Sequence, residues 1–210
     1  MCAPVELSLP AGGAVALVGA NGSGKSTVLR TVLGLLDPLG GAVTALGRPV
    51  DERRASFRRA VASVLDEAAW FPALTVAEHL DLLARGHGVR DVGDVVDEIL
   101  DEFGLWDEAD SMPGALSSGQ RRRLLLASAF VRPRTLLVLD EPEQRLDTAM
   151  RGQVAERLVA EKAAGVAVLF ATHDPEMLVE VADEAVLLAD DECPVLAPGE
   201  AAAVLRSTPT

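Results

Sequence analysis

The feature that most constrains the fold of this 210-residue chain is a glycine-rich loop at residues 19–27, GANGSGKST. It fits the pattern G-x-x-x-x-G-K-[ST], which a chain of this composition matches by accident on the order of one time in a thousand. Residues 14–18 before it have the length and apolarity of a buried strand, and residues 28–33 after it keep helical spacing. In such a strand, loop and helix unit, main-chain N–H groups and the helix N-terminus bind phosphate. The sequence therefore predicts a nucleotide site formed by Asn21, Gly22, Ser23, Gly24, Lys25, Ser26 and Thr27, in which Lys25 reaches the β- and γ-phosphates and Ser26 ligates Mg²⁺.

A second motif, LLVLDE at residues 136–141, places two carboxylates at the end of an apolar run. A buried strand of an open parallel sheet ends at the binding crevice, so Asp140 and Glu141 are expected to face the nucleotide. Asp140 is predicted to hold Mg²⁺ through water, and Glu141 to polarise the water that attacks the γ-phosphate. A solvated turn explains such a pair about as well when it stands alone. The phosphate loop upstream favours the catalytic interpretation.

Strand-like and helix-like runs alternate in residues 1–70 and again in 134–210, and only helix-like runs lie between them. This order predicts an α/β fold with a mainly parallel sheet covered by helices on both faces, and an all-helical insertion at 71–133. Thr75 and Glu78 form a capping box that opens the first insertion helix. Strands are expected at 5–9, 14–18, 61–65, 135–139, 166–170 and 185–188, a short strand and turn at 40–47, a basic helix or turn at 51–59, and helices at 25–36, 75–85, 92–103, 118–131, 148–163, 174–181 and 201–206.

The composition excludes several classes of protein. The net charge of −13 argues against a protein whose task is to bind nucleic acid, so the arginines at 53–54, 58–59 and 121–123 are interpreted as solvated helix faces or partner contacts. Two cysteines are too few for a disulfide framework, which indicates a reducing compartment. The longest apolar runs are far shorter than the ~20 residues that span a bilayer. We expect a cytoplasmic chain, with any membrane part supplied by another chain.

A third motif, LSSGQ at residues 116–120, adds a family resemblance. Together with the phosphate loop and the acidic strand end, it makes the chain resemble the ATP-binding cassette (ABC) ATPases over nearly its whole length; their signature, L-S-G-G-Q, differs only at Ser118. The resemblance implies a head-to-tail dimer with two shared sites. In that dimer Ser117, Gly119 and the helix start contact the γ-phosphate bound to the opposing subunit. Ser117, Ser118, Gly119 and Gln120 are thus candidates for a partner site, although an ordinary helix cap explains the motif if it stands alone.

The same resemblance assigns three more residues. His173, just after a predicted strand, matches the switch histidine that bonds the γ-phosphate and orients the water, whereas His79 and His87 are interpreted as structural. Asp147 matches the loop that crosses the dimer interface, although residues 143–145, EQR, differ from the small residues often found there. Asp66 stands where the family has a Gln that senses Mg²⁺; its carboxylate can still ligate Mg²⁺, and altered metal dependence or slower cycling is expected.

The resemblance also implies an architecture: one domain over 1–210, in which 1–70 and 134–210 form the RecA-like core of a phosphate-loop NTPase and 71–133 form the helical subdomain. Compared with the family, the N-terminal antiparallel β part is expected to be shortened, unless the true start lies further upstream, and the aromatic residue that stacks on adenine is missing, since the first aromatic here is Phe57. Looser selectivity for the base is therefore expected.

The function implied is that of an ATP-hydrolysing ABC transporter subunit, with ATP and Mg²⁺ as cofactors. It would form a homodimer, or a heterodimer with another ABC ATPase, and attach peripherally to the membrane through separate transmembrane permease subunits, without nucleic acid. An alternative is a weakly hydrolysing regulatory or structural partner of the same family, favoured by Asp66, Ser118 and the absent adenine platform. A third reading, a soluble family member acting on ribosomes or DNA, is disfavoured by the acidic charge and the single cassette.

Overall fold

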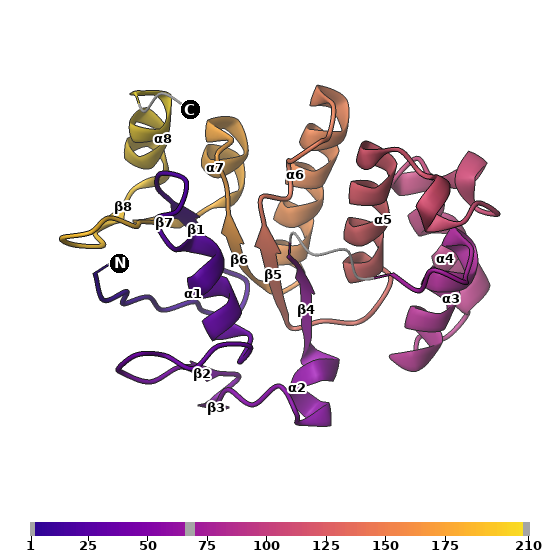
Figure 1. The fold of residues 1–210 in the computed structure, drawn as a ribbon, viewed down its shortest axis with the longest axis horizontal. Helices are drawn as coiled ribbons and strands as arrows, with labels where there is room; N and C mark the ends of the chain where they lie inside the picture. Colours follow the sequence, from indigo (N-terminus) through magenta and orange to yellow (C-terminus); the bar gives the residue numbers. More distant parts are fainter. Residues whose placement is uncertain (1–2, 66–69, 208–210) are drawn as a thin grey trace.

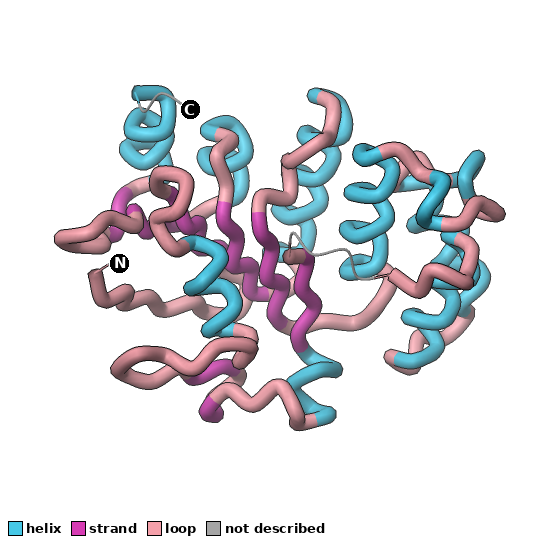
Figure 2. Tube along the Cα trace, viewed as in Figure 1, coloured by secondary structure: helices cyan, strands magenta, loops and turns pink. Residues whose placement is uncertain are grey.

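A six-stranded sheet forms the centre of the computed structural model, which describes residues 3–65 and 70–207. The strand order is β4-β5-β6-β1-β7-β8 (Figure 1), and Figure 2 shows the helices packed around these strands. Neighbouring strands run parallel except β8, which pairs antiparallel with β7. The strands span Val61–Val64 (β4), Leu136–Asp140 (β5), Ala167–Ala171 (β6), Ala14–Val18 (β1), Glu184–Leu187 (β7) and Val195–Leu196 (β8).

The register of the three central strands brings their carboxyl ends together. β6 lies between β1 and β5, and its Ala171 pairs with Leu17 on one side and with Asp140 on the other. The segments that follow these strands therefore meet at one edge of the sheet, where open α/β sheets bind ligands. The phosphate loop after β1, Glu141 after β5 and His173 after β6 all start from this edge, although they lie far apart in the sequence.

Both faces of the sheet are covered, as predicted. Alternate residues of β1 face opposite sides, so Val15 and Leu17 pack with α1 (Lys25–Val32), while Ala14, Ala16 and Val18 pack with the helices behind the sheet. Every residue of β1, β5 and β6 is buried, as expected for parallel strands between two helical layers. The helices behind the sheet are α6 (Thr148–Ala163), α7 (Pro175–Val181) and α8 (Pro198–Ser207) (Figure 1).

The N-terminal part differs from the prediction. Residues 5–9 are extended but belong to no strand of the described chain; Val5, Leu7 and Leu9 instead anchor the segment by packing on the α1 face of the sheet. The alternation that predicted a strand is thus real, but it reflects burial of every second side chain without a strand ladder. The predicted strand and turn at 40–47 is a hairpin of β2 (Thr44–Ala45) and β3 (Arg48–Pro49), followed by the short helix α2 (Ala55–Ala60).

The segment between β4 and β5 contains helices and no strand within its described residues. Its helices are α3 (Val76–Gly86), α4 (Val92–Glu102), the 3-10 turns η1 (Trp106–Glu108) and η2 (Pro113–Ala115), and α5 (Ser118–Phe130). The capping box at the start of α3 is confirmed, since Thr75 and Glu78 each bond the other's main-chain N–H. Apolar side chains of these helices join the same core as the sheet.

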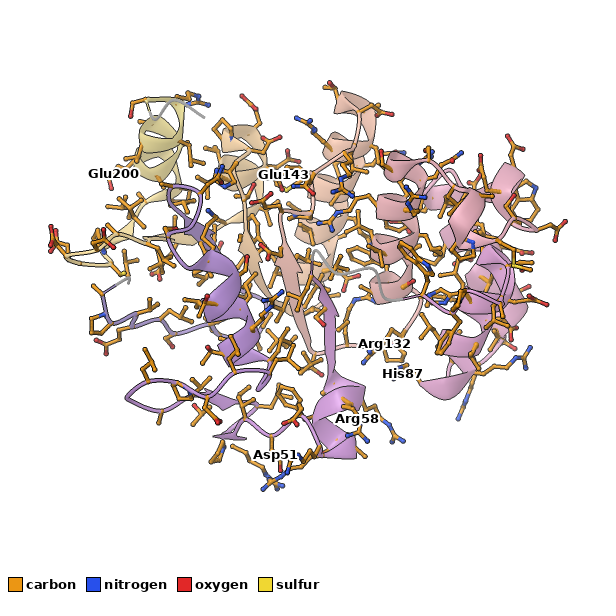
Figure 3. All side chains as sticks on the ribbon, viewed as in Figure 1. Asp51, Arg58, His87, Arg132, Glu143 and Glu200 are labelled. Atoms are coloured by element: carbon orange, nitrogen blue, oxygen red, sulfur yellow. The ribbon has the colours of Figure 1, made fainter. Side chains whose placement is uncertain are left out.

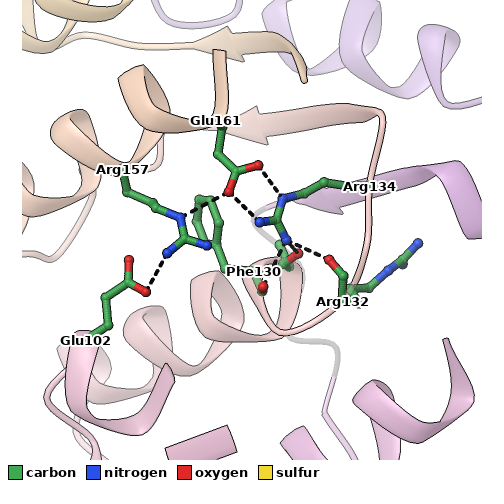
Figure 4. Close-up of polar contacts among 7 residues, drawn as sticks. Glu102, Phe130, Arg132, Arg134, Arg157 and Glu161 are labelled. Carbon is green, nitrogen blue, oxygen red and sulfur yellow. Dashed lines mark hydrogen bonds and ion pairs between the residues drawn. The ribbon is translucent and has the colours of Figure 1, made fainter. Parts of the chain in front are cut away.

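A partly buried ion network ties this helical segment to the helix α6 behind the sheet (Figure 4). The carboxylate of Glu161 binds the guanidinium groups of Arg134 and Arg157, and Arg157 Nη1 also donates to Glu102 Oε2 of α4 at 2.8 Å. Both guanidinium groups lie against the ring of Phe130, at 5.0 and 5.1 Å from its centroid. Arg157 thus links Glu161 of α6 to Glu102 of α4, and Arg134 links Glu161 to the main chain at the end of α5.

Candidate functional site

The glycine-rich loop closes on its own lysine. Lys25, the first residue of α1, is only 6% exposed, and its ammonium donates to the main-chain oxygens of Gly19 at 3.0 Å and Ala20 at 3.1 Å. Gly19 and Gly24 have φ angles of 146° and 102°, a region that L-residues with a side chain rarely adopt. The two glycines therefore allow the turn that brings the end of β1 over the start of the helix.

The interior of this loop has the properties of an anion cradle. The Ser23 hydroxyl is buried and makes no hydrogen bond within the described chain. A Cβ on Gly19 would lie 2.8 Å from that hydroxyl and 2.7 Å from the main-chain oxygen of Leu188, so a side chain there would fill the cradle. Ser26 and Thr27 are exposed at the helix N-terminus, where partial positive charge favours phosphate. These observations fit a nucleotide whose phosphates occupy the loop.

The electrostatics of the site fit a divalent cation as well. Burial lowers the pKa of the Lys25 ammonium, and three nearby carboxylates oppose this shift, those of Glu141, Asp140 and Glu143. One ammonium cannot balance three carboxylates and a triphosphate, and Mg²⁺ is usually held by one or two carboxylates together with substrate phosphates. The hydroxyl of Ser26 and the carboxylate of Asp140 supply oxygen ligands of the kind required.

The predicted catalytic pair is assembled from two neighbouring strands. Glu141 follows β5 and His173 follows β6, and Glu141 Oε1 lies 3.3 Å from His173 Nε2. Glu141 has a φ of 47°, unusual for a residue with a side chain, and its main-chain N–H donates to Ala171 of β6 at 2.9 Å. Strained backbone of this kind is concentrated at functional sites.

Arg122 holds the loop that carries Asp140 and Glu141. The prediction of a solvated face or partner contact is wrong for this residue, which is 4% exposed and whose Nη2 donates to the main-chain oxygens of Asp140 at 2.5 Å and Glu141 at 2.7 Å. Arg121 and Arg123 also donate to main-chain oxygens of their own chain. A signal was present, because residues 122, 126 and 129 recur at helical spacing and all are buried.

The signature residues begin α5, away from the chain's own phosphate loop. Ser117 caps the helix: its hydroxyl accepts from the N–H of Gln120 at 3.2 Å, and the Gln120 side chain accepts from the Ser117 N–H at 2.7 Å. The ordinary-cap interpretation therefore describes this isolated chain. A hydroxyl that accepts one hydrogen bond keeps its proton to donate, however, and Ser117 and Ser118 are exposed. A Cβ on Gly119 would lie 3.0 Å from the Arg145 oxygen, so glycine suits this close contact.

The remaining predicted residues are placed as follows. Asp147 is exposed and caps α6 by accepting from the N–H of Met150 at 2.9 Å. Asp66 lies outside the described residues. His79 is structural, as predicted: it is 1% exposed, its Nε2 lies 3.0 Å from the Ser128 hydroxyl, and burial lowers its pKa.

Figure 3 shows that several basic side chains lie at the end of the molecule opposite this site. Glu143 lies beyond the carboxyl ends of the strands, whereas Arg58, Arg132 and His87 lie near their other ends. Arg132 donates to the main-chain oxygens of Arg58 at 2.5 Å and Val61 at 2.9 Å. These arginines therefore stabilise local structure and do not take part in the phosphate site.

The fold and the site together define a nucleotide-binding protein of the phosphate-loop NTPase class. The family model described as "ABC transporter" matches residues 2–144. The chain is 35% identical over 188 residues to the SkfA peptide export ATP-binding protein SkfE of Bacillus subtilis, covering 89% of this chain and 78% of the relative. It is 38% identical over 191 residues to the aliphatic sulfonates import ATP-binding protein SsuB of Pseudomonas putida, covering 90% and 67%. The chain thus belongs to the ABC transporter family, as an ATP-binding subunit.

Solved structures agree with this assignment. An ATP-binding subunit of an ABC transporter superposes with a TM-score of 0.83 at 27% identity, over 96% of this chain and 91% of that one. A dimeric ATP-binding cassette in a post-hydrolysis state, bound to ADP and Pi, has the same fold with a TM-score of 0.80 at 22% identity, over 91% and 88%. Among residues 3–65 and 70–207, no helix combines the length and apolarity needed to cross a bilayer.

Proposed function

We propose that the chain is the ATP-hydrolysing motor subunit of a transporter, in which two such subunits close on two ATP·Mg²⁺ and drive membrane-spanning chains encoded separately. The observation that carries this proposal is the convergence of the Lys25 loop, Asp140, Glu141 and His173 at the carboxyl edge of β1, β5 and β6. The named relatives include an export and an import protein, so the proposal specifies the motor and not its cargo.

Each residue has a distinct role in this proposal. The main-chain N–H groups of the loop and the Lys25 ammonium hold the β- and γ-phosphates, and the oxygens of Ser26 and Asp140 hold Mg²⁺, which neutralises charge on the transferred phosphoryl group. Glu141 accepts a proton from the attacking water, and His173, 3.3 Å from the Glu141 carboxylate, orients that water and the γ-phosphate. Arg122 fixes the Glu141 main chain, so the carboxylate is positioned before ATP binds.

The second half of each site comes from another subunit in this proposal. Ser117, Ser118, Gly119 and Gln120 begin a helix whose N-terminus is favourable for phosphate, and the exposed Ser117 hydroxyl keeps a proton to donate. Asp147 lies exposed at the start of α6, where it can meet the facing subunit. Closure on ATP and opening after hydrolysis is then a ligand-driven shift between two states.

Steady-state phosphate release from the full chain with ATP and Mg²⁺ tests the roles. Lys25→Ala is expected to weaken ATP binding, and Lys162→Ala is the matched control, because the ammonium of this only other lysine binds Val181 and Asp183. Glu141→Gln is expected to abolish hydrolysis and to accumulate an ATP-bound dimer, measured by light scattering. Parent-rate hydrolysis by Glu141→Gln contradicts the assigned base. ATP binding without hydrolysis by the parent chain, with or without membrane partners, favours the regulatory alternative.

A further inference from the structure

The catalytic pair is held by two polar side chains that lie two and three residues after Glu141, and neither has a role in the function proposed so far. The first is Gln144, whose Nε2 donates to Glu141 Oε2 at 3.0 Å. His173 Nε2 lies 3.3 Å from the other oxygen, Glu141 Oε1. The carboxylate of the general base is thus contacted on both oxygens, by a different side chain on each.

The second side chain, Glu143, holds the histidine through its main chain. Glu143 Oε1 accepts from the main-chain N–H of His173 at 2.9 Å and from the Thr172 hydroxyl at 2.7 Å. The Thr172 hydroxyl in turn accepts from the N–H of Asp174 at 2.9 Å. Glu143 is 7% exposed and Thr172 is fully buried, so water competes little for these bonds. The loop after β5 and the loop after β6 are joined at the residue that carries the switch imidazole.

A burial cost supports a role beyond ordinary loop closure. Glu143 Oε2 is buried and makes no hydrogen bond within the described chain, and burial raises the pKa of this carboxyl. A buried, half-satisfied carboxyl opposes folding. An apolar residue could fill the same space, but it could not accept the N–H of His173. Glu143 therefore fixes the main chain of His173 at a cost to the stability of the folded chain, and this combination is found at functional sites.

We propose that Glu143 and Gln144 are positioning residues for ATP hydrolysis: Glu143 fixes the main chain of His173, and Gln144 fixes the carboxylate of Glu141. The proposal rests on the roles given above to Glu141 and His173. Proton transfer to a base needs hydrogen-bond reach and correct direction, and small displacements of reacting groups lower the rate steeply. The contacts of both side chains are to the catalytic pair and not to the phosphate loop. Loss of either contact should therefore lower kcat without raising the KM for ATP; replacing the Glu143 carboxylate also removes a negative charge near Lys25, which favours ATP binding.

Two substitutions test Gln144, which is half-buried. Gln144→Met keeps the length of the side chain but cannot donate, and a lost hydrogen bond to a charged group predicts a fall in kcat of about tenfold. Gln144→Glu keeps the shape, cannot donate when ionised and opposes the Glu141 charge, so a larger fall of about a hundredfold is expected. Gln153→Met and Gln153→Glu, at an exposed position of α6, are the matched controls and should retain the parent kcat.

Glu143 is tested by removal and by conservative replacement. Glu143→Leu removes the acceptor at similar volume and should lower kcat about tenfold. Glu143→Gln keeps an oxygen to accept from His173 and Thr172, and should keep kcat within about twofold of the parent. If Glu143 had only a structural role, we would not expect Glu143→Gln to recover the kcat that Glu143→Leu loses while both variants have the same KM for ATP. Circular dichroism establishes folding of each variant; if Glu143→Leu is unfolded, the Gln144 series and Glu143→Gln decide the outcome.

Glu141→Gln measured in parallel separates the two levels of the argument. Hydrolysis at the parent rate by Glu141→Gln overturns the assigned base, and with it the proposed function of this site. If Glu141→Gln is inactive while Gln144→Glu keeps the parent kcat, the positioning role of Gln144 is overturned. A tenfold fall in kcat for Glu143→Gln overturns the positioning role of the pair. A change in the KM for ATP alone, in either the Glu143 or the Gln144 series, overturns it as well.

Discussion

The ion network around Glu161 predicts a large loss of stability from one conservative substitution outside the nucleotide site. The Glu161 side chain is 8% exposed and its carboxylate binds both Arg134 and Arg157. Glu161→Gln keeps the volume and one acceptor oxygen but removes the negative charge between two guanidinium groups. Arg134, which is 8% exposed, would then lie buried without the charge of residue 161, whereas Arg157, which is 29% exposed, would keep its pair with Glu102 (Figure 4).

Removing one partner of a buried ion pair costs about 3 to 5 kcal/mol, whereas an exposed pair contributes about 0.2 to 1 kcal/mol. The control is Asp81→Asn, because Asp81 and Arg85 form an exposed pair on α3 with side chains 39% and 65% exposed. Urea unfolding followed by circular dichroism should show a lower midpoint for Glu161→Gln with an unchanged slope. If Glu161→Gln costs no more than Asp81→Asn, the network does not stabilise the fold as argued.

The pH dependence provides a second test of the same network. Burial alone would raise the pKa of Glu161, but the hydrogen bonds and charges of Arg134 and Arg157 lower it below its usual 4.5. The folded-state pKa is then below the unfolded one, so the stabilisation is present above about pH 4.5 and is lost as the pH falls through the lowered value. The difference between the parent and Glu161→Gln should narrow over that acid range. A difference that stays constant would refute the assigned charge.

Three further outcomes are expected. Gly19→Ala should lose ATP affinity and thermal stability, because the φ of 146° disfavours a side chain and its Cβ would lie 2.7 Å from the Leu188 oxygen; thermal shift with and without ATP measures both. Gly119→Ala, with its Cβ 3.0 Å from the Arg145 oxygen, should reduce ATP-dependent dimerisation measured by light scattering. Glu143→Gln should be more stable than the parent above about pH 4.5, because burial raises the pKa of Glu143 and charging it opposes folding; the gain should vanish as urea midpoints are measured at lower pH.

Each of these outcomes has a result that contradicts it. Parent-like ATP affinity of Gly19→Ala means that the loop accepts a side chain in the cradle. Unchanged dimerisation of Gly119→Ala means that the contact with Arg145 yields at no cost to the interface. A gain for Glu143→Gln that persists below pH 4 means that its source is packing and not the buried charge.

The sequence was sufficient to predict the sheet and the strand, loop and helix unit that carries the phosphate motif, because these depend on short-range patterns. The glycines of the loop, the apolar runs that end in Asp140, and the cap at Thr75 each follow from a few adjacent residues. β8 was missed because its two residues, Val195–Leu196, are too short to show a period. The strand expected at 5–9 was wrong because alternation reports which side chains are buried and says nothing of the neighbour needed for a ladder.

Contacts between distant segments could not be predicted from the sequence, for a different reason. The bond from Glu143 to the N–H of His173 joins residues 30 positions apart, and it depends on β5 and β6 being neighbours in register. The EQR segment at 143–145 differs from the residues often found there in the family, but its composition alone is that of an exposed polar turn. Only the register shows that Glu143 turns inward while Arg145 stays exposed.

Helix α5 carries both the signature residues and Arg122, which contacts a distant segment of the chain. Ser117 begins α5 and Arg122 lies just over one turn later, so a single rigid element carries the signature residues at its exposed end and donates to the Asp140 and Glu141 carbonyls from its buried face. A guanidinium can hold both oxygens at once because its donors are fixed in a plane. The helix that would contact a partner's nucleotide is thereby fastened to the catalytic loop of its own subunit. A displacement of the start of α5 cannot leave the Glu141 main chain unaffected unless those hydrogen bonds lengthen.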